Sequence, residues 1–205
     1  MCFGKGLSQQ KAEDCMYPHP NNFCGGFALN AVLAELRTGT GFNNPMEVYC
    51  KIQEYQTYNV AGNGYRFLHD TRFIVNGTLM SLPSGICAAF NSYPTGKKVV
   101  VYYTTEFGSS PMFGALIGEE SGRITALGIH VEVFDGDLPT IDQSYVLVLV
   151  NDCHWIAVKR IEEGKNFICY DPATGNAETG DSMITAMQKS GYGPGSINGL
   201  YICIP

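Results

Sequence analysis

The stretch Asn21-Asn22-Phe23-Cys24-Gly25-Gly26-Phe27-Ala28-Leu29-Asn30-Ala31-Val32-Leu33-Ala34-Glu35-Leu36 predicts a helix that begins at a cysteine. Apolar side chains cover nearly every face of residues 27–36, and a helix that is apolar all round is buried. Its first N–H groups have no partner within the helix, and together with the helix dipole they favour the thiolate form of Cys24. The stretch therefore offers either a nucleophile at a helix N-terminus or a small apolar cysteine at the edge of a core.

Length and composition are typical of one globular domain. The chain has 205 residues, of which 45% are hydrophobic and 16% charged, and this length is ample for a full core.

A formal net charge of −6 and a pI near 5.1, without any basic run, argue against a nucleic-acid or anionic-membrane partner. No apolar run approaches the roughly 20 residues of a membrane span. Residues 1–14 also lack the apolar core of a Sec signal peptide, so we expect a cytoplasmic protein or one exported without a cleaved signal.

The cysteines are scattered and form no Cys-x-x-Cys pair, which excludes zinc-ribbon spacing. The eight positions are Cys2, Cys15, Cys24, Cys50, Cys87, Cys153, Cys169 and Cys203. A core of this size needs no disulfides, so reduced thiols are expected, with no metal and no cofactor.

The first half of the chain is predicted to be mainly helical. Asn44-Pro45-Met46-Glu47 combines a cap residue, a proline suited to the first helical position and a glutamate at the third. This pattern predicts a second helix, which continues through Tyr55. Leu82-Pro83-Ser84-Gly85 opens a third helix, and Tyr93-Pro94-Thr95-Gly96 ends it.

The second half is dominated by β-branched and aromatic runs. These runs predict six strands, at residues 98–103, 127–134, 145–150, 153–161, 166–170 and 200–204. Two short helices are expected between them, one from Ser110-Pro111 through Ile117 and one at residues 181–189. Helices followed by a mainly antiparallel sheet indicate a single α+β domain over residues 1–205. Its helical lobe would span about residues 1–95 and its sheet lobe about residues 96–205.

A cysteine nucleophile needs a base that takes its proton and a third group that orients the base. Two of the four histidines, His19 and His69, lie in proline-flanked or polar stretches. His130 lies in an alternating strand, where a half-buried structural role is expected. His154 differs because it follows a very apolar strand and an Asn151-Asp152 turn, and it opens the next strand. His154 is therefore the candidate base.

The hairpin after His154 brings an acidic residue toward it. If Ile161 pairs with Asn166 across the turn, Asp171 lies opposite Ile156. Ile156 and His154 share a face because side chains alternate along a strand. Asp171 then becomes the diagonal neighbour of His154, about 7–8 Å away between backbones. A turn-forming aspartate before a proline would have the same sequence.

Two motifs resemble those of a known family. Cys24-Gly25-Gly26-Phe27-Ala28-Leu29 resembles the Cys-Gly-x-x-Ala-Leu helix start of papain-fold peptidases, especially the C39-like bacterial group. His154-Trp155-Ile156-Ala157-Val158, followed by Tyr170-Asp171-Pro172-Ala173-Thr174-Gly175, resembles that group's His-Trp strand and Asp-Pro-x-x-Gly hairpin end. The 130 residues from Cys24 to His154 (154 − 24) also lie within the roughly 130–150 of papain-type enzymes.

The resemblance implies a papain-like fold, with the cysteine on a buried central helix of the helical lobe. It further implies that Cys24 is the nucleophile, His154 the general base and acid, and Asp171 the residue that orients His154.

The chain departs from the family at the oxyanion hole. The family usually carries a glutamine six residues before the cysteine, and here that position is Pro18, which cannot donate a hydrogen bond. The remaining candidate donors are Asn21, Asn22 or His19, together with the backbone N–H of Cys24.

The two neighbours of His154 have different expected roles. The resemblance implies that Trp155, the single tryptophan, shields the bond between His154 and Asp171, although an ordinary buried aromatic fits the sequence equally well. Cys153 should face away from His154 and is expected to be structural. The Gly- and Tyr-rich residues 59–65 and 190–201 are expected to flank the site.

Three functions remain open at this point. The first is a thiol hydrolase that cleaves a peptide or amide bond of a protein or peptide substrate through a thioester, and such an enzyme could be a secreted effector or toxin. The second is a glutamine deamidase or transglutaminase with the same triad, and the third is a catalytically inactive papain-fold binding module. The oligomeric state and the substrate specificity have no signature in the sequence.

Overall fold

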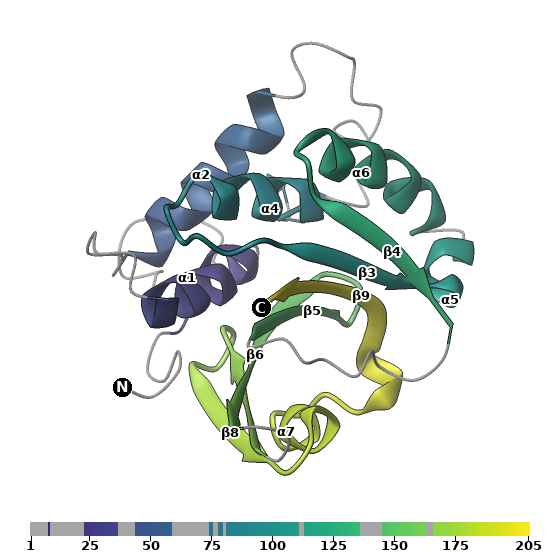
Figure 1. The fold of residues 1–205 in the computed structure, drawn as a ribbon. Helices are drawn as coiled ribbons and strands as arrows, with labels where there is room; N and C mark the ends of the chain where they lie inside the picture. Colours follow the sequence, from purple (N-terminus) through teal and green to yellow (C-terminus); the bar gives the residue numbers. More distant parts are fainter. Residues whose placement is uncertain are drawn as a thin grey trace.

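A computed structural model of the chain describes Ser8 and residues 23–36, 44–58, 74–75, 78–79, 81–110, 113–135, 145–162 and 166–205. This part of the chain is an α+β fold with six α-helices and a seven-stranded mixed sheet (Figure 1). A separate two-stranded pair joins β1 (Ile74–Val75) to β2 (Thr78–Leu79).

Six α-helices lie in the described part of the chain. They are α1 (Cys24–Leu36), α2 (Pro45–Tyr58), α4 (Pro83–Asn91), α5 (Thr105–Ser109), α6 (Gly114–Ala126) and α7 (Met183–Lys189). At the start of α2, the Asn44 Oδ1 accepts a hydrogen bond from the Met46 N–H at 3.0 Å. The Asn44 amide in turn lies 3.4 Å from the Glu47 carboxylate. The predicted cap of α2 is confirmed.

The sheet has the order β4-β3-β9-β5-β6-β7-β8. Its strands are β3 (Val100–Thr104), β4 (His130–Phe134), β5 (Tyr145–Val150), β6 (His154–Glu162), β7 (Asn166–Asp171), β8 (Asn176–Gly180) and β9 (Ile197–Ile204). Only β3 and β4 pair in parallel, and every other neighbouring pair is antiparallel. The sheet is thus mixed and mainly antiparallel.

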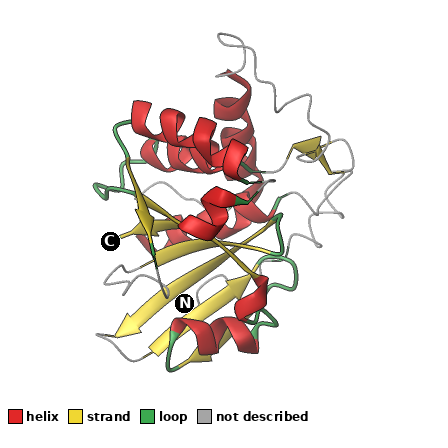
Figure 2. Cartoon of the chain, turned by 90° about the vertical axis from the view of Figure 1, so that its right-hand side faces the viewer, coloured by secondary structure: helices red, strands yellow, loops and turns green. Residues whose placement is uncertain are grey.

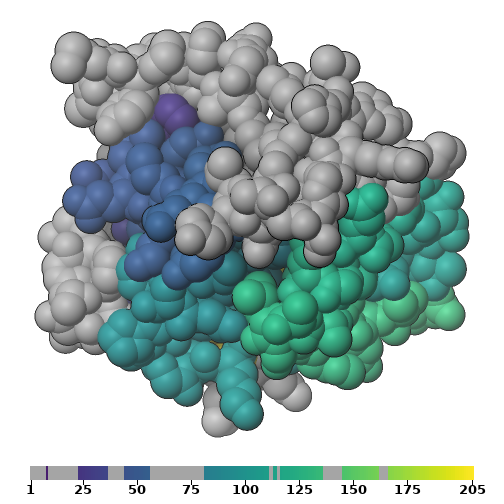
Figure 3. Space-filling model, turned by 90° about the horizontal axis from the view of Figure 1, so that it is seen from above, coloured from purple at the N-terminus to yellow at the C-terminus, as the bar shows by residue number. Residues whose placement is uncertain are grey.

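The sheet is covered by helices on both faces. Leu147 and Leu149 of β5 pack in the same cluster as α1, α2, α4 and α6. Val146, Val148 and Val150 pack on the opposite face, against α7. Figure 2 shows the larger group of helices on one side of the sheet and α7 on the other. Seen from above, blue and teal-to-green segments form most of the described surface, and almost no yellow of the C-terminal strand is seen (Figure 3).

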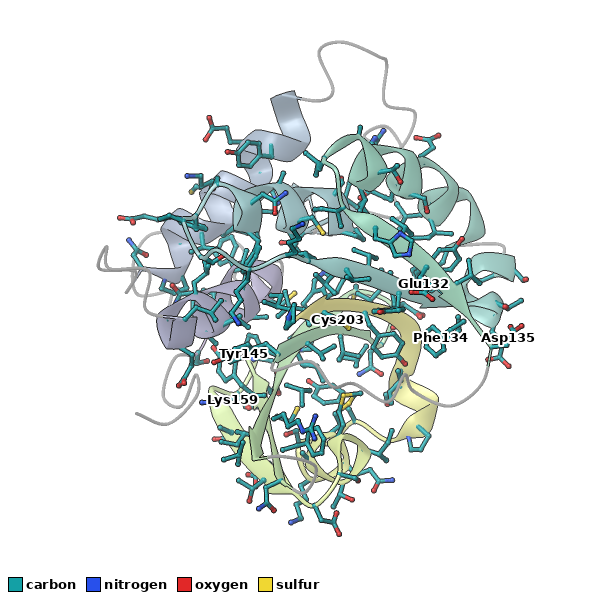
Figure 4. All side chains as sticks on the ribbon, viewed as in Figure 1. Glu132, Phe134, Asp135, Tyr145, Lys159 and Cys203 are labelled. Carbon is teal, nitrogen blue, oxygen red and sulfur yellow. The ribbon has the colours of Figure 1, made fainter. Side chains whose placement is uncertain are left out.

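An ion pair joins the C-terminal end of α1 to the sheet. The Nζ of Lys159 on β6 lies 2.6 Å from the carboxylate of Glu35. The same ammonium group lies 6.0 Å from the ring centre of Tyr145 on β5, and Figure 4 shows these two side chains beside each other next to α1. The contact ties the far end of α1, about three turns from Cys24, to the two strands beneath it.

The hairpin register near His154 follows the prediction. Ala157 of β6 pairs with Tyr170 of β7, so the next positions along the ladder are Ile156 and Asp171. β7 therefore ends at Asp171, opposite Ile156, and His154 is the first residue of β6, two positions before Ile156.

The pairing at the turn end of this hairpin was predicted wrongly. Asn166 pairs with Glu162 and not with Ile161, because the register shifts between Arg160 and Glu162. A β-bulge adds one residue to one strand and displaces the pairing locally. This irregularity lies at the turn, so the ladder closer to His154 keeps the predicted pairs.

Several elements differ from the sequence prediction. Helix α5 and strand β8 were not predicted, because α5 is only five residues long and β8 is a short polar run. Helix α6 continues to Ala126, well beyond the predicted end near Ile117, and it packs against α4 of the helical layer. The predicted strand from residue 127 accordingly begins only at His130. The division into lobes near residue 95 remains a prediction.

His130 also differs from the prediction. Its side chain is 71% exposed and lies 3.8 Å from Glu132, so the expected half-buried role is wrong. The reason is that β4 is the edge strand of the sheet and pairs only with β3.

Candidate active site

Cys24 is the first residue of α1 and is almost completely buried, with 1% of its surface exposed. The two following glycines allow two other segments to approach the helix closely. A Cβ at position 25 would overlap Ser81, and a Cβ at position 26 would overlap Tyr49 of α2. Glycine is therefore required here for packing of the first helical turn, and this packing places the Cys24 sulfur next to β6.

The thiol of Cys24 points at the turn that precedes β6. Its Sγ lies 3.8 Å from the carbonyl oxygen of Cys153. Cys153 thus contacts Cys24 through its backbone carbonyl group, whereas Cys153 as a residue is exposed. The predicted structural role of the Cys153 side chain agrees with this arrangement and remains a prediction.

The turn before His154 has an unusual backbone. Asn151 and Asp152 both adopt positive φ angles, 48° and 65°, a region that Asn and Asp tolerate better than other non-glycine residues. Asn198 of β9 holds this turn, because its Oδ1 accepts from the Asp152 N–H at 2.8 Å and its amide donates back to the Asp152 carboxylate. The Asn151 N–H also donates to the Ser196 carbonyl at 2.8 Å. These bonds determine where the chain enters β6 at His154.

His154 connects the sulfur to a carboxylate. Its Nε2 lies 2.8 Å from the Oδ1 of Asp171, and Cys24 is close enough to act on the pKa of the ring. Since an ionised carboxylate only accepts, Nε2 carries the proton toward Asp171, and Nδ1 is the ring nitrogen left for Cys24. Burial lowers the pKa of His154, but the bonds to Asp171 and Cys24 and the charges of both groups raise it to about 9. The arrangement therefore favours an imidazolium.

Asp171 is a buried carboxylate with several donors around it. Oδ1 accepts from the Ala173 N–H at 2.9 Å as well as from His154, and Oδ2 accepts from the Thr174 hydroxyl at 3.2 Å. Burial raises the pKa of Asp171, but the bond to His154, the histidine charge, the Ala173 N–H and the Tyr192 hydroxyl lower it below its usual value. Asp171 is thus held as an anion.

Tyr192 lies beside His154, although no motif in the sequence marks it. Its ring centre lies 5.9 Å from that of His154, with 30° between the ring planes, and its hydroxyl is among the groups that lower the pKa of Asp171. Residues 190–201 were expected beside the site, but nothing in the sequence separates this tyrosine from the others of the chain. Only the path of the chain after α7 brings it beside His154.

Trp155 lies on the other face of β6. Its side chain is fully buried, packs in the cluster that contains α1, and donates its indole N–H to the Ser81 carbonyl at 2.8 Å. The ring that the structure stacks on His154 is that of Tyr192. A shielding role for Trp155 remains a prediction.

The predicted oxyanion donors Asn21, Asn22 and His19 lie outside the described residues. From the N-terminal region the structure describes Ser8, whose hydroxyl donates to the Ala173 carbonyl at 3.2 Å, in the loop after Asp171. Residues 59–65, also expected beside the site, are not among those described either.

The described residues show neither a metal-binding cluster nor a membrane-spanning helix. No group of three or more His, Cys, Asp or Glu side chains in them has the geometry to hold a metal ion. None of the described helices is long and apolar enough to cross a membrane.

Comparison with known proteins adds little about this site. No protein-family model and no curated protein matches the sequence. The crystal structure of the Pseudomonas avirulence protein AvrPphB is similar to the chain at 12% identity and a TM-score of 0.38, over 90% of this chain and 91% of that one. A likeness at this identity and TM-score says nothing about activity, so the function has to be inferred from the residues of this chain.

Proposed function

We propose that the chain is a papain-like thiol hydrolase that cleaves a peptide or amide bond of a protein or peptide substrate. The observation that supports this most is the 2.8 Å bond between His154 and Asp171, made by an imidazole whose pKa is raised in part by Cys24, at the start of a buried helix. A nucleophile, a base and a group that orients the base are the three parts that acyl transfer by cysteine requires.

The chemistry follows from these positions. The Cys24 thiolate attacks the carbonyl carbon of the substrate, a C–S bond forms, and the carbonyl electron pair moves to the oxygen. His154 then gives a proton to the leaving amine as the C–N bond breaks, which leaves a thioester on Cys24. In the second half, His154 takes a proton from water, the resulting hydroxide attacks the thioester, and Cys24 leaves as the thiolate.

The oxyanion of the tetrahedral intermediate needs donors. The first N–H groups of a helix lack partners within it, so the Cys24 N–H is one proposed donor. A side chain from Asn21, Asn22 or His19 is proposed as the second, in place of the family's glutamine.

Alkylation of Cys24 by iodoacetamide tests the proposed nucleophile. At a pH of about 6 an ordinary thiol, with a pKa of about 8.5, reacts slowly. A purely structural Cys24, 1% exposed, would react more slowly than the exposed Cys50 and Cys153 at every pH. We expect the opposite order at pH about 6, measured by mass spectrometry of the labelled peptides.

Three variants complete this experiment. Cys24→Ala and His154→Ala should each abolish hydrolysis, whereas Cys153→Ala should retain it because Cys153 contacts Cys24 through its carbonyl group. Loss of activity in Cys153→Ala together with activity in Cys24→Ala would overturn the assignment. Incubation with candidate protein substrates separates chain cleavage from the roughly one-dalton mass gain of glutamine deamidation.

A further inference from the structure

Tyr192 lies just after α7 and is held there by its backbone. Its N–H donates to the Met187 carbonyl at 2.9 Å, and its side chain is 9% exposed within the cluster between α7 and the sheet. This position explains burial of the ring, but it does not require a hydroxyl group there.

The side chain of Tyr192 contacts two members of the proposed triad at once. The ring stacks on His154 at 5.9 Å between centres, and the hydroxyl is among the groups that lower the pKa of the Asp171 carboxyl. Because an ionised carboxylate only accepts, the hydroxyl is the donor. Burial, followed by the nearby Asp171 charge, raises the pKa of Tyr192 well above its usual value. The hydroxyl therefore remains a donor throughout the working pH range.

We infer that Tyr192 is a positioning residue of the site, which holds Asp171 through its hydroxyl and supports the imidazolium of His154 through the face of its ring. The inference rests on the proposed function, since it assigns a role within the same triad.

The two contacts have separate physical effects. A donor to Asp171 stabilises its anion, so that the carboxylate stays ionised and bound to His154 at lower pH. The face of an aromatic ring carries negative charge, and a cation within about 6 Å of the ring centre is attracted to it. The ring contact therefore favours the imidazolium over the neutral imidazole and extends the imidazolium form to higher pH.

Two variants of Tyr192 separate these effects. Tyr192→Phe keeps the ring and removes only the hydroxyl, and Tyr192→Leu removes both. The matched control is Tyr201→Phe, because Tyr201 is a buried tyrosine of the same cluster that contacts Phe134 and not the triad.

The pH dependence of Cys24 alkylation and the titration of His154 by NMR are the two readouts. In Tyr192→Phe, the acidic limb of the alkylation profile should move to higher pH by about half a unit. The alkaline limb should not move to lower pH. In Tyr192→Leu, the alkaline limb and the His154 titration should both move to lower pH. Tyr201→Phe should match wild type in both.

Failure of this inference and failure of the proposed function give different results. If Tyr192→Phe and Tyr201→Phe both match wild type, Tyr192 is only a core residue and the inference fails. If Tyr192→Leu does not fold, the Tyr192→Phe profile alone decides. Failure of the proposed function has a different signature, because then wild-type Cys24 itself shows no alkylation at acidic pH, whatever the variants do.

Discussion

At the scale of single residues, the charge of His154 depends on its two partners. Burial alone would keep the ring neutral, but Asp171 and Cys24 together raise its pKa to about 9. Asp171 in turn needs its own donors to remain an anion in a buried place, and Ala173 and Thr174 supply two of them from the loop that follows it. The charge at the site thus depends on a chain of hydrogen bonds, each of which can be removed singly.

Replacement of Asp171 by Asn tests whether it supports the imidazolium. Asn keeps the shape of the side chain but removes the charge, so the His154 limb of the pH–rate profile should move to lower pH. The rate should fall on the order of 10²–10⁴-fold, and Asp171→Ala should be worse because the ring also loses its anchor. The measurement is rate against pH for wild type and both variants.

The control for this prediction is Asp181→Asn, which makes the same change at an exposed position at the start of the α7 region. It should leave the profile unchanged. An unshifted histidine limb in Asp171→Asn would remove Asp171 from the triad and leave a Cys24–His154 dyad.

At the scale of elements, the contact between α6 and α4 depends on a buried carboxylate. The Glu120 side chain of α6 is fully buried and accepts from the Ser84 N–H, in the first turn of α4, at 2.7 Å. Arg123 lies 2.8 Å from its other oxygen. Burial raises the pKa of Glu120, and the bonds from Ser84 and Arg123 act against this rise. Glu120 therefore joins the two helices by satisfying a backbone N–H that no intrahelical partner reaches.

Two alanine substitutions one residue apart test this contact. Glu120→Ala leaves a buried N–H and a cavity, so the free energy of unfolding should fall by about 3 kcal/mol. Glu119 pairs with the same arginine at 3.4 Å but is 44% exposed, so Glu119→Ala should cost less than about 0.5 kcal/mol. Urea denaturation of the two variants measures both values, and equal costs would contradict the assigned role of Glu120.

At the scale of the whole molecule, the residues of the proposed triad come from separate parts of the fold. Cys24 comes from the helical layer, His154 and Asp171 from neighbouring strands, and Tyr192 from the segment after α7 on the other side of the sheet. Bonds among these side chains therefore contribute to global stability as well as to the site.

The pH dependence of unfolding reports this contribution. The pKa of His154 is raised from 6.5 to about 9 in the folded protein, so the stabilisation is complete below pH 6.5 and is lost as the pH rises through about 9. The difference in unfolding free energy between wild type and His154→Gln should accordingly shrink over this range. In a Cys24→Ser background the loss should occur at lower pH, because the contribution of Cys24 to the raised pKa of His154 is then absent. A difference that stays constant from pH 6.5 to 9 would show that the ring is neutral.

Much of the local structure was determined by the sequence alone. The starts of α1, α2 and α4 follow from Cys24, from the Asn44-Pro45 cap and from Pro83, because capping depends on groups a few residues apart. The register of β6 and β7 near His154 follows from a short hairpin, in which pairing is set by a nearby turn. The proximity of His154 to Asp171 could also be predicted, because the register is set by the turn and side chains alternate along the strands.

The remaining features were decided only by the tertiary structure. The parallel pairing of β3 with β4, the exposure of His130 and the position of Tyr192 beside the triad all depend on segments that lie far apart in the sequence. Such contacts form only when whole layers pack, and the energy that selects them is spread over many buried side chains rather than encoded in a local motif. Tyr192 shows this most clearly, since tyrosine is common in the chain. Only the return of the chain after α7 brings its hydroxyl near Asp171.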